Sequence, residues 1–222
     1  TLVVVSEGNK VMGRTDKATF ADSGFFQIFP RKWLAVNPSS ALNKPNSVVI
    51  SQSNLERYFP GVQPIDALGK ELIWIDRDTI QTQVTGVVED YTKNTDFIFK
   101  AFISYSTIQT EEQKEWYGLH SWGNVNSSSQ LFIKAEPKQN VEILGNSLAK
   151  LAEKHYDENE NSKTSFSAEP LAEMHFGQNY TDTSVSKVFL NGLIYIGLII
   201  SALATLNFVN LETAQAIGRA KE

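Results

Sequence analysis

The stretch "VFLNGLIYIGLIISALATLNFVNL", residues 188–211, contains no charged residue and stands between Lys187 and Glu212. At about 1.5 Å per residue, a helix of this length measures roughly 36 Å, which exceeds the roughly 30 Å of a bilayer's hydrocarbon core. A buried core helix can also be apolar all round, but globular helices commonly run about eight to twenty residues. The sequence therefore predicts a transmembrane helix over residues 188–211.

Small residues recur at a spacing of four within this stretch, at Gly197, Ser201 and Thr205. Residues four apart share one face of a helix, and small side chains let the backbone of a second membrane helix approach closely. We therefore predict that Gly197, Ser201 and Thr205 form a helix-packing site.

The orientation of the predicted span follows from the basic residues near its ends. Arg219 and Lys221 follow it, whereas Lys187 and Lys163 are the nearest basic residues on the other side. Cytoplasmic flanks carry an excess of Lys and Arg. This bias predicts that residues 212–222 begin a cytoplasmic segment and that the larger N-terminal part lies outside the cytoplasm.

The composition limits the classes of function. The chain has 222 residues, a net charge of −5 and no cysteine. Its Lys and Arg residues are scattered, whereas nucleic-acid binding needs a basic patch, so we predict no nucleic-acid partner. Without cysteine, neither disulfides nor thiolate metal sites can form.

Periodicity predicts a mostly β unit over residues 22–95, preceded by a pair of strands within residues 1–21 that turns near Gly8 and Asn9. The elements predicted within this unit are a short helix in "DSGFFQIFP" (22–30), a strand over 48–51, a helix with Leu55, Tyr58 and Phe59 on one face, and strands in "KELIWID" (70–76) and "QTQVTGVVED" (81–90) joined by a turn.

The next segment, residues 96–180, has the pattern of an α/β unit. The predicted elements are strands in "KAFISYST" (100–107) and "LFIKAEP" (131–137), a helix in "NVEILGNSLAKLAEKHYDEN" (140–159) with Asn140 as candidate cap, and a strand-like segment in "SFSAEPLAEMHF" (165–176). Such a unit needs further strands to complete its sheet, and we assign the opening strands, residues 1–21, to it. The predicted fold class is therefore α+β, with a β-rich unit inserted into an α/β unit.

The residues that commonly carry chemistry form no recognised pattern. His120, His155 and His175 are isolated and lack the spacing of a zinc site. The acidic pair flanking position 77, Asp76 and Asp78, is typical of a hairpin turn. Neither a phosphate-binding loop nor a G-x-S-x-G motif is present. We therefore predict no catalytic residue, no cofactor and no metal ligand.

Five segments in a fixed order nevertheless resemble a known family. They are "FADSGFFQIF" (20–29), "NSVVISQSNLERYFPG" (46–61), "VTGVVEDYTKNTDFIFKAFIS" (84–104), "EPLAEMHF" (169–176) and "NFVNLETAQAIGRAKE" (207–222). Together they resemble the MacB-like periplasmic core domain and the adjoining FtsX-like permease segment of ABC transporters.

The resemblance implies a porter-like α/β subdomain, residues 1–21 and 96–180, with an inserted β-rich subdomain, residues 22–95, followed by the second transmembrane helix of a permease. It implies a further membrane helix before residue 1 and two after the last residue. The expected location is the bacterial inner membrane, with the main domain in the periplasm or outside the cell.

The partners implied by the resemblance are an ABC ATPase subunit, a second permease subunit and membrane lipid, with a periplasmic adaptor or an outer-membrane channel left open. On this reading the chain is not an enzyme, because ATP is hydrolysed by a separate ATPase domain or subunit. Two alternatives remain open at this point: a single-span extracytoplasmic sensor or ligand-binding module, and an exported hydrolase tethered by the helix.

Overall fold

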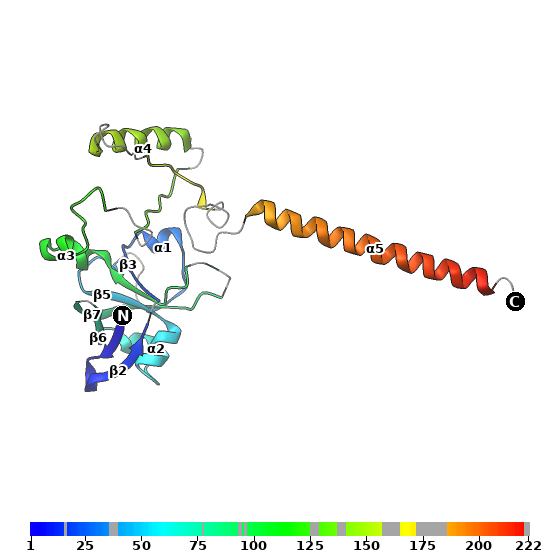
Figure 1. Cartoon of the computed structure of the whole chain (residues 1–222). Helices are drawn as coiled ribbons and strands as arrows, with labels where there is room; N and C mark the ends of the chain where they lie inside the picture. The colour runs from blue at the N-terminus through cyan, green and yellow to red at the C-terminus, as the bar shows by residue number, and fades with distance from the viewer. Residues whose placement is uncertain are drawn as a thin grey trace. The chain divides into compact units, whose positions relative to one another are not determined.

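The computed structural model describes residues 1–15, 17–35, 40–76, 78–92, 95, 97–124, 129–136, 141–156, 165–171 and 186–219 (Figure 1). The chain divides into two compact units, Thr1–Glu136 and Pro137–Glu222. The first unit contains a sheet with its covering helices, and the second contains two long helices. Each unit is described by itself below.

One mixed eight-stranded sheet organises the first unit. Its strands are β1 (Leu2–Val5), β2 (Lys10–Arg14), β3 (Ala18–Ala21), β4 (Trp33–Ala35), β5 (Ser47–Ser51), β6 (Glu71–Ile75), β7 (Thr79–Val88) and β8 (Ala101–Ser104). The order across the sheet is β2-β1-β6-β7-β5-β8-β3, with β4 paired to β7. The pairs β5–β7 and β3–β8 are parallel, and the other pairs are antiparallel.

The first two strands form the predicted hairpin. β1 pairs antiparallel with β2, and a turn of 3₁₀ helix, η1 (Glu7–Asn9), joins them. Gly8 has a φ of 80°, a left-handed conformation that glycine adopts without steric cost. The Lys70 ammonium lies 2.7 Å from the Glu7 carboxylate and ties this turn to the start of β6. The sequence prediction for residues 1–14 is confirmed.

Strand β5 forms the centre of the core because it is apolar on both faces. Val48 and Ile50 belong to one buried cluster, which also contains Trp74. Val49 belongs to a second cluster, with Phe102. Successive side chains of a strand point to opposite faces, so side chains cover the sheet on both sides of β5. This explains the continuous apolar run of β5, and the predicted strand over residues 48–51 is confirmed.

The helices of the first unit are short. They are α1 (Phe25–Ile28), α2 (Gln52–Tyr58), η2 (Pro64–Ala67), η3 (Tyr105–Gln109) and α3 (Glu111–Trp116). Side-chain caps begin two of them, Ser51 at α2 and Thr110 at α3. The Asp22 carboxylate accepts a hydrogen bond from the Phe25 amide at 3.1 Å, as an N-terminal cap does. Helix α2 buries Leu55 and Tyr58, with Phe59 directly after it, which confirms the predicted apolar face.

Two strand predictions are wrong. Residues 131–136 and 165–171 are described, and neither segment is a strand; residues 172–176, the rest of the second prediction, lie outside the described residues. The first segment begins with three consecutive apolar residues, of which Phe132 packs against distant rings: its ring lies 5.0 Å from the Phe29 ring and 5.4 Å from the Phe97 ring. Its neighbours Leu131 and Ile133 are 84% and 53% exposed, so this apolar run is not the face of a buried strand.

The second unit contains helices α4 (Val141–His155) and α5 (Lys187–Arg219), which confirms a helix in each predicted place. The candidate cap Asn140 lies outside the described residues. The predicted fold class, a mixed α and β domain followed by an apolar C-terminal helix, is confirmed. The division into a porter-like subdomain and an inserted β-rich subdomain stays a prediction.

Candidate functional site

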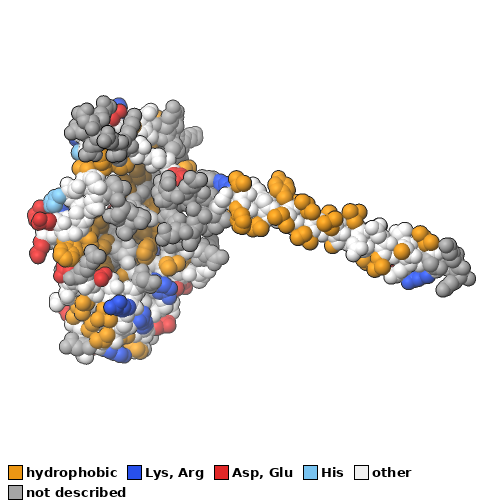
Figure 2. Space-filling view, viewed as in Figure 1, with side chains coloured by type: hydrophobic (Ala, Val, Ile, Leu, Met, Phe, Trp, Pro, Cys, Tyr) orange, Lys and Arg blue, Asp and Glu red, His pale blue; other side chains and the backbone are white. Residues whose placement is uncertain are grey.

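Helix α5 is the first candidate, because it contains the predicted span. Within Lys187–Ile217, an 18-residue window has a mean hydropathy of 2.0, and none of that window is buried. By length and composition the helix can cross a membrane, and apolar side chains cover much of its length (Figure 2). The helix continues without a break beyond Glu212 to Arg219, so the predicted boundary at residue 212 is not a helix end.

The predicted packing residues on α5 satisfy their own hydrogen bonds. The Ser201 hydroxyl donates to the Gly197 carbonyl at 2.9 Å, and the Thr205 hydroxyl donates to the Ser201 carbonyl at 2.9 Å. A hydroxyl satisfied in this way is compatible with hydrocarbon, where an unsatisfied polar group is costly. The three residues therefore offer a small surface without a free donor, and their contact with another helix stays a prediction.

Three histidines were considered for catalysis or metal binding. His120 Nε2 is 3.4 Å from the Glu111 carboxylate on the surface, His155 ends α4, and His175 lies outside the described residues. In the described part of the chain, no group of three or more His, Cys, Asp or Glu residues is placed to hold a metal ion.

The acidic pair between β6 and β7 forms the predicted hairpin turn. The Asp76 amide donates to the Asp78 carbonyl at 3.0 Å. Hydrogen bonds from the Gln113 side-chain amide and the Thr79 backbone amide hold the pKa of Asp78 below its usual range. These bonds fix the turn and leave the carboxylate in a structural role.

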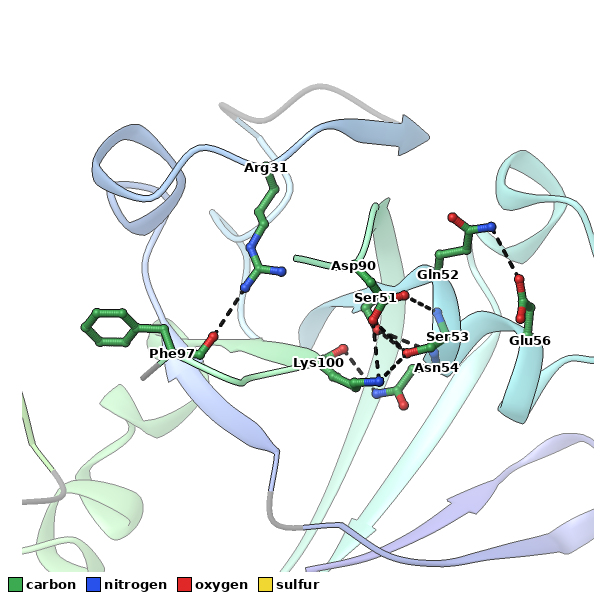
Figure 3. A network of polar contacts seen from close by, with 9 residues as sticks. All are labelled: Arg31, Ser51, Gln52, Ser53, Asn54, Glu56, Asp90, Phe97 and Lys100. Atoms are coloured by element: carbon green, nitrogen blue, oxygen red, sulfur yellow. Dashed lines mark hydrogen bonds and ion pairs between the residues drawn. The ribbon is translucent and has the colours of Figure 1, made fainter. Parts of the chain in front are cut away.

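A polar network lies where β5 and β7 end and β8 begins (Figure 3). The Ser53 amide and hydroxyl donate to the Asp90 carboxylate at 2.7 and 2.8 Å. The Lys100 ammonium lies 3.5 Å from Asp90 and donates to the Ser53 hydroxyl at 2.8 Å. The Asn54 side chain donates to the Lys100 carbonyl at 3.1 Å, while the Ser51 hydroxyl accepts from the Asn54 amide. The network thus links the start of α2 to the strands on both sides.

The surroundings of Asp90 in this network favour the charged form of its carboxylate. Partial burial raises the pKa of Asp90, but the Ser53 hydrogen bonds, the Lys100 charge and the Ser51 hydroxyl outweigh burial and hold that pKa below its usual range. The Ser53 hydroxyl donates to Asp90 rather than to a neutral base, and Lys100 is ion-paired. A serine nucleophile needs an adjacent base to take its proton. The geometry therefore assigns this network a structural role.

Arg31 lies beside the network. Its guanidinium is 4.7 Å from the centre of the Tyr91 ring and 5.7 Å from that of Phe102. It also donates to the Phe97 carbonyl at 3.5 Å (Figure 3). Burial lowers the pKa of Arg31, although the Tyr91 and Asp90 charges act in the opposite direction. Arginine stays protonated in proteins, so a positive charge is held against aromatic faces here.

A depression of about 220 Å³ opens next to the network. The residues that line it are Arg14, Thr15, Lys17, Ser53, Asn54, Arg57 and Lys100. These residues come from three separate segments, from the end of β2 to Lys17, from α2, and from the residue before β8. No motif in the sequence brings them together, so sequence reasoning missed this depression, and only the sheet order places them side by side.

Comparisons with known proteins identify the family. Residues 2–151 match the family model of the MacB-like periplasmic core domain. No curated protein sequence matches the chain.

Two solved structures are similar to this one. A domain of a protein described as a permease from Porphyromonas gingivalis is 18% identical, with a TM-score of 0.50 over 72% of this chain and 61% of that one. The periplasmic region of MacB from Actinobacillus actinomycetemcomitans is 20% identical, with a TM-score of 0.41 over 68% of this chain and 60% of that one. This chain thus spans about three fifths of each of those chains.

The family match covers the described sheet and its helices, from β1 to most of α4, in a chain whose α5 is long and apolar enough to span a membrane. The resemblance in the sequence and the family model agree. The chain belongs to the MacB-like periplasmic core domain family.

Proposed function

We propose that this chain is the extracytoplasmic domain and one membrane helix of an ABC transporter permease, which transmits an ATP-driven conformational change across the membrane for export or extraction of a substrate. The observation that carries this proposal is the succession of a MacB-like core domain, residues 2–151, and the apolar helix α5. A domain of this family joined to a helix of this kind is suited to couple the two sides of a bilayer.

The construction of α5 supports a mechanical role. The helix contains 33 residues, which corresponds to roughly 50 Å at about 1.5 Å per residue. It contains no proline, the residue most often responsible for a sharp kink. A straight helix that runs on from the apolar segment through Glu212 to Arg219 can carry a displacement from one of its ends to the other.

The proposed setting is the bacterial inner membrane, with the core domain in the periplasm and residues 212–222 on the cytoplasmic side. The position of Arg219 and Lys221 after the span supports this orientation. The proposed partners are an ABC ATPase subunit, a second permease subunit and lipid, with an adaptor or outer-membrane channel as a further one. ATP hydrolysis then belongs to the ATPase, and this chain contributes no catalytic residue.

Co-purification tests the proposal. The full-length membrane protein is expressed in its native host, extracted in a mild detergent and isolated by an affinity tag, and its bound proteins are identified by mass spectrometry. The same preparation is assayed for ATP hydrolysis with and without vanadate. The matched control is the protein truncated before Lys187, which retains the core domain and lacks α5.

The expected result is an ABC ATPase that co-purifies with the full-length protein but not with the truncated form, together with vanadate-sensitive hydrolysis. Recovery of a signalling protein in place of an ATPase would contradict the proposal and favour an extracytoplasmic sensor. Turnover of ester, peptide or glycoside substrates by the purified core domain would favour a tethered hydrolase.

A further inference from the structure

The depression beside the polar network concentrates positive charge in a protein whose net charge is −5. Its cationic lining residues are Arg14, Lys17, Arg57 and Lys100. Among the described residues, no Asp or Glu lines it, and only Asp90 pairs with one of these cations, at 3.5 Å from Lys100. Asp16, which lies between two lining residues in sequence, is outside the described residues. Figure 2 shows several Lys and Arg side chains, with acidic side chains among and beside them, over the part of the first unit that carries β2 and α2.

Two of these cations have no partner in the described part of the chain. The side chains of Arg14 and Lys17 make no ion pair and no hydrogen bond with any described residue. Lys17 is nevertheless half-buried. A charge that is partly removed from water without a partner raises the free energy of the fold. An anion in the depression would offset that cost.

The other two cations, Arg57 and Lys100, have more N–H donors than their contacts with described residues use. The Arg57 guanidinium carries five N–H donors, and one bond goes to the Met12 carbonyl. The Lys100 ammonium has three donors, of which one goes to the Ser53 hydroxyl and another points toward Asp90. Both side chains are thus anchored by protein contacts and still able to bind a ligand.

The backbone around the depression is fixed, which lowers the entropic cost of binding. The Lys17 carbonyl accepts hydrogen bonds from the amides of Lys100, at 2.8 Å, and Ala101, at 3.2 Å. The Thr15 hydroxyl accepts from the Lys17 amide at 3.2 Å. The segment bearing Arg14 and Lys17 is therefore held against the start of β8, and its two cations do not have to be brought to the site.

The charge balance selects the class of ligand. Counting only residues that the structure describes, four cations offset by one carboxylate leave an excess of three positive charges at the depression. A carboxylate ligand would balance one of them, whereas a phosphate group carries about 1.5 to 2 negative charges and several acceptor oxygens that suit arginine. The depression, of about 220 Å³, is also several times larger than the roughly 30 Å³ that one water molecule occupies in the liquid, so a phosphate group has room there.

From these contacts we infer that the depression formed by Arg14, Lys17, Arg57 and Lys100 is a binding site for a phosphate group. This inference stands apart from the proposed transport role, since it rests on the residues of the first unit alone. The phosphate group can be free or can belong to a lipid headgroup, and the two sources share the same chemistry.

Isothermal titration calorimetry on the full chain in a non-ionic detergent tests the inference, at constant ionic strength. The probes are inorganic phosphate and glycerophosphoglycerol, a soluble phosphodiester with the headgroup chemistry of a lipid. The variant is Arg14→Gln with Lys17→Gln, because these side chains make no ion pair and no hydrogen bond with the described residues. The matched control is Lys10→Gln with Lys44→Gln, which removes the same charge from exposed lysines outside the depression. Thermal unfolding of all three proteins checks that each is folded.

The expected result is saturable binding by the wild type and the control, with affinity about tenfold lower or worse in the Arg14/Lys17 variant. Binding of phosphate but not of the diester would identify a free phosphate or monoester, and equal binding of the diester would identify a lipid headgroup. The inference is overturned if neither probe binds saturably, or if the control loses as much affinity as the variant. It is also overturned if sulfate and chloride compete as well as phosphate does, which would show an adventitious ion only.

Discussion

At the scale of single residues, Asp90 shows how the fold uses charge. Its carboxylate receives two hydrogen bonds from Ser53 and lies beside the Lys100 ammonium, so one side chain joins the end of β7, the start of α2 and the start of β8. A carboxylate that accepts several hydrogen bonds is stabilised in its charged form. The lowered pKa of Asp90 is the consequence.

Replacing Asp90 by Asn should lower the free energy of unfolding at pH 7 by about 1 to 3 kcal/mol, because charge-assisted hydrogen bonds and an ion pair are lost. The folded-state pKa is lowered, so the stabilisation by Asp90 is fully present above the unfolded pKa of about 3.9 and is lost as the pH falls through the folded value. The difference between wild type and variant should therefore vanish in acid.

Urea unfolding of both proteins across this pH range measures the effect, with Asp66→Asn as the control. Asp66 is exposed, and its side chain forms no hydrogen bond or ion pair with the described residues, so this change should alter stability by less than about 0.5 kcal/mol. An equal loss of stability by the Asp90 variant at pH 7 and at low pH would contradict the electrostatic explanation.

At the scale of elements, α5 combines a long apolar helix with one face of small residues. The hydroxyls of Ser201 and Thr205 bond to carbonyls of the same helix, so this face needs no polar partner. Any contribution to packing then comes from the small size of Gly197, Ser201 and Thr205, which allows two backbones to approach closely.

Replacing Ser201 by Leu in the full-length membrane protein should weaken its assembly with other membrane helices by about 1 kcal/mol or more, roughly fivefold. Replacing Ser201 by Ala keeps the side chain small and should leave assembly unchanged. Ala202→Leu adds similar bulk about 100° around the helix and serves as the control. Cross-linking yield and size-exclusion chromatography in detergent measure assembly. If the Ser201→Leu variant assembles as well as the wild type does, the prediction of a packing site on this face is contradicted.

At the scale of the whole molecule, the first unit contains the described sheet and both buried clusters. The strands that enclose them lie within Thr1–Glu136, so the unit has its own hydrophobic core. A unit with its own core is able to fold alone. The second unit contributes two long helices, of which α5 is exposed along its length.

A fragment of residues 1–136 should therefore unfold cooperatively, with a Tm within about 5 °C of the full chain in detergent, a difference equivalent to about 1 kcal/mol. Near-ultraviolet circular dichroism reports the fixed packing of Trp74 and Phe102 in the two clusters. A fragment without a near-ultraviolet signal or a cooperative transition would show that Pro137–Glu222 is needed for folding.

Local sequence patterns were sufficient to predict those helices and strands whose residues are determined by neighbours in the chain. The β1–β2 hairpin, the apolar strand β5 with the α2 face, and the helices α4 and α5 all follow from hydrophobic periodicity and turn residues. The segment at 131–136 was predicted wrongly because its short apolar run contains Phe132, which packs edge-to-face against two distant rings, and a window of sequence cannot show such contacts.

The amino-acid sequence was enough to identify an α+β domain of the MacB-like family followed by an apolar helix long enough to cross a bilayer, because both conclusions rest on residues adjacent in the chain. Which charged residues meet became clear from the folded chain. The sheet order brings Lys100 beside Asp90. It also brings the Arg14–Lys17 segment beside α2, which lies far from that segment in the sequence. Charges interact through space, so their pairing and the phosphate site inferred from it depend on the fold.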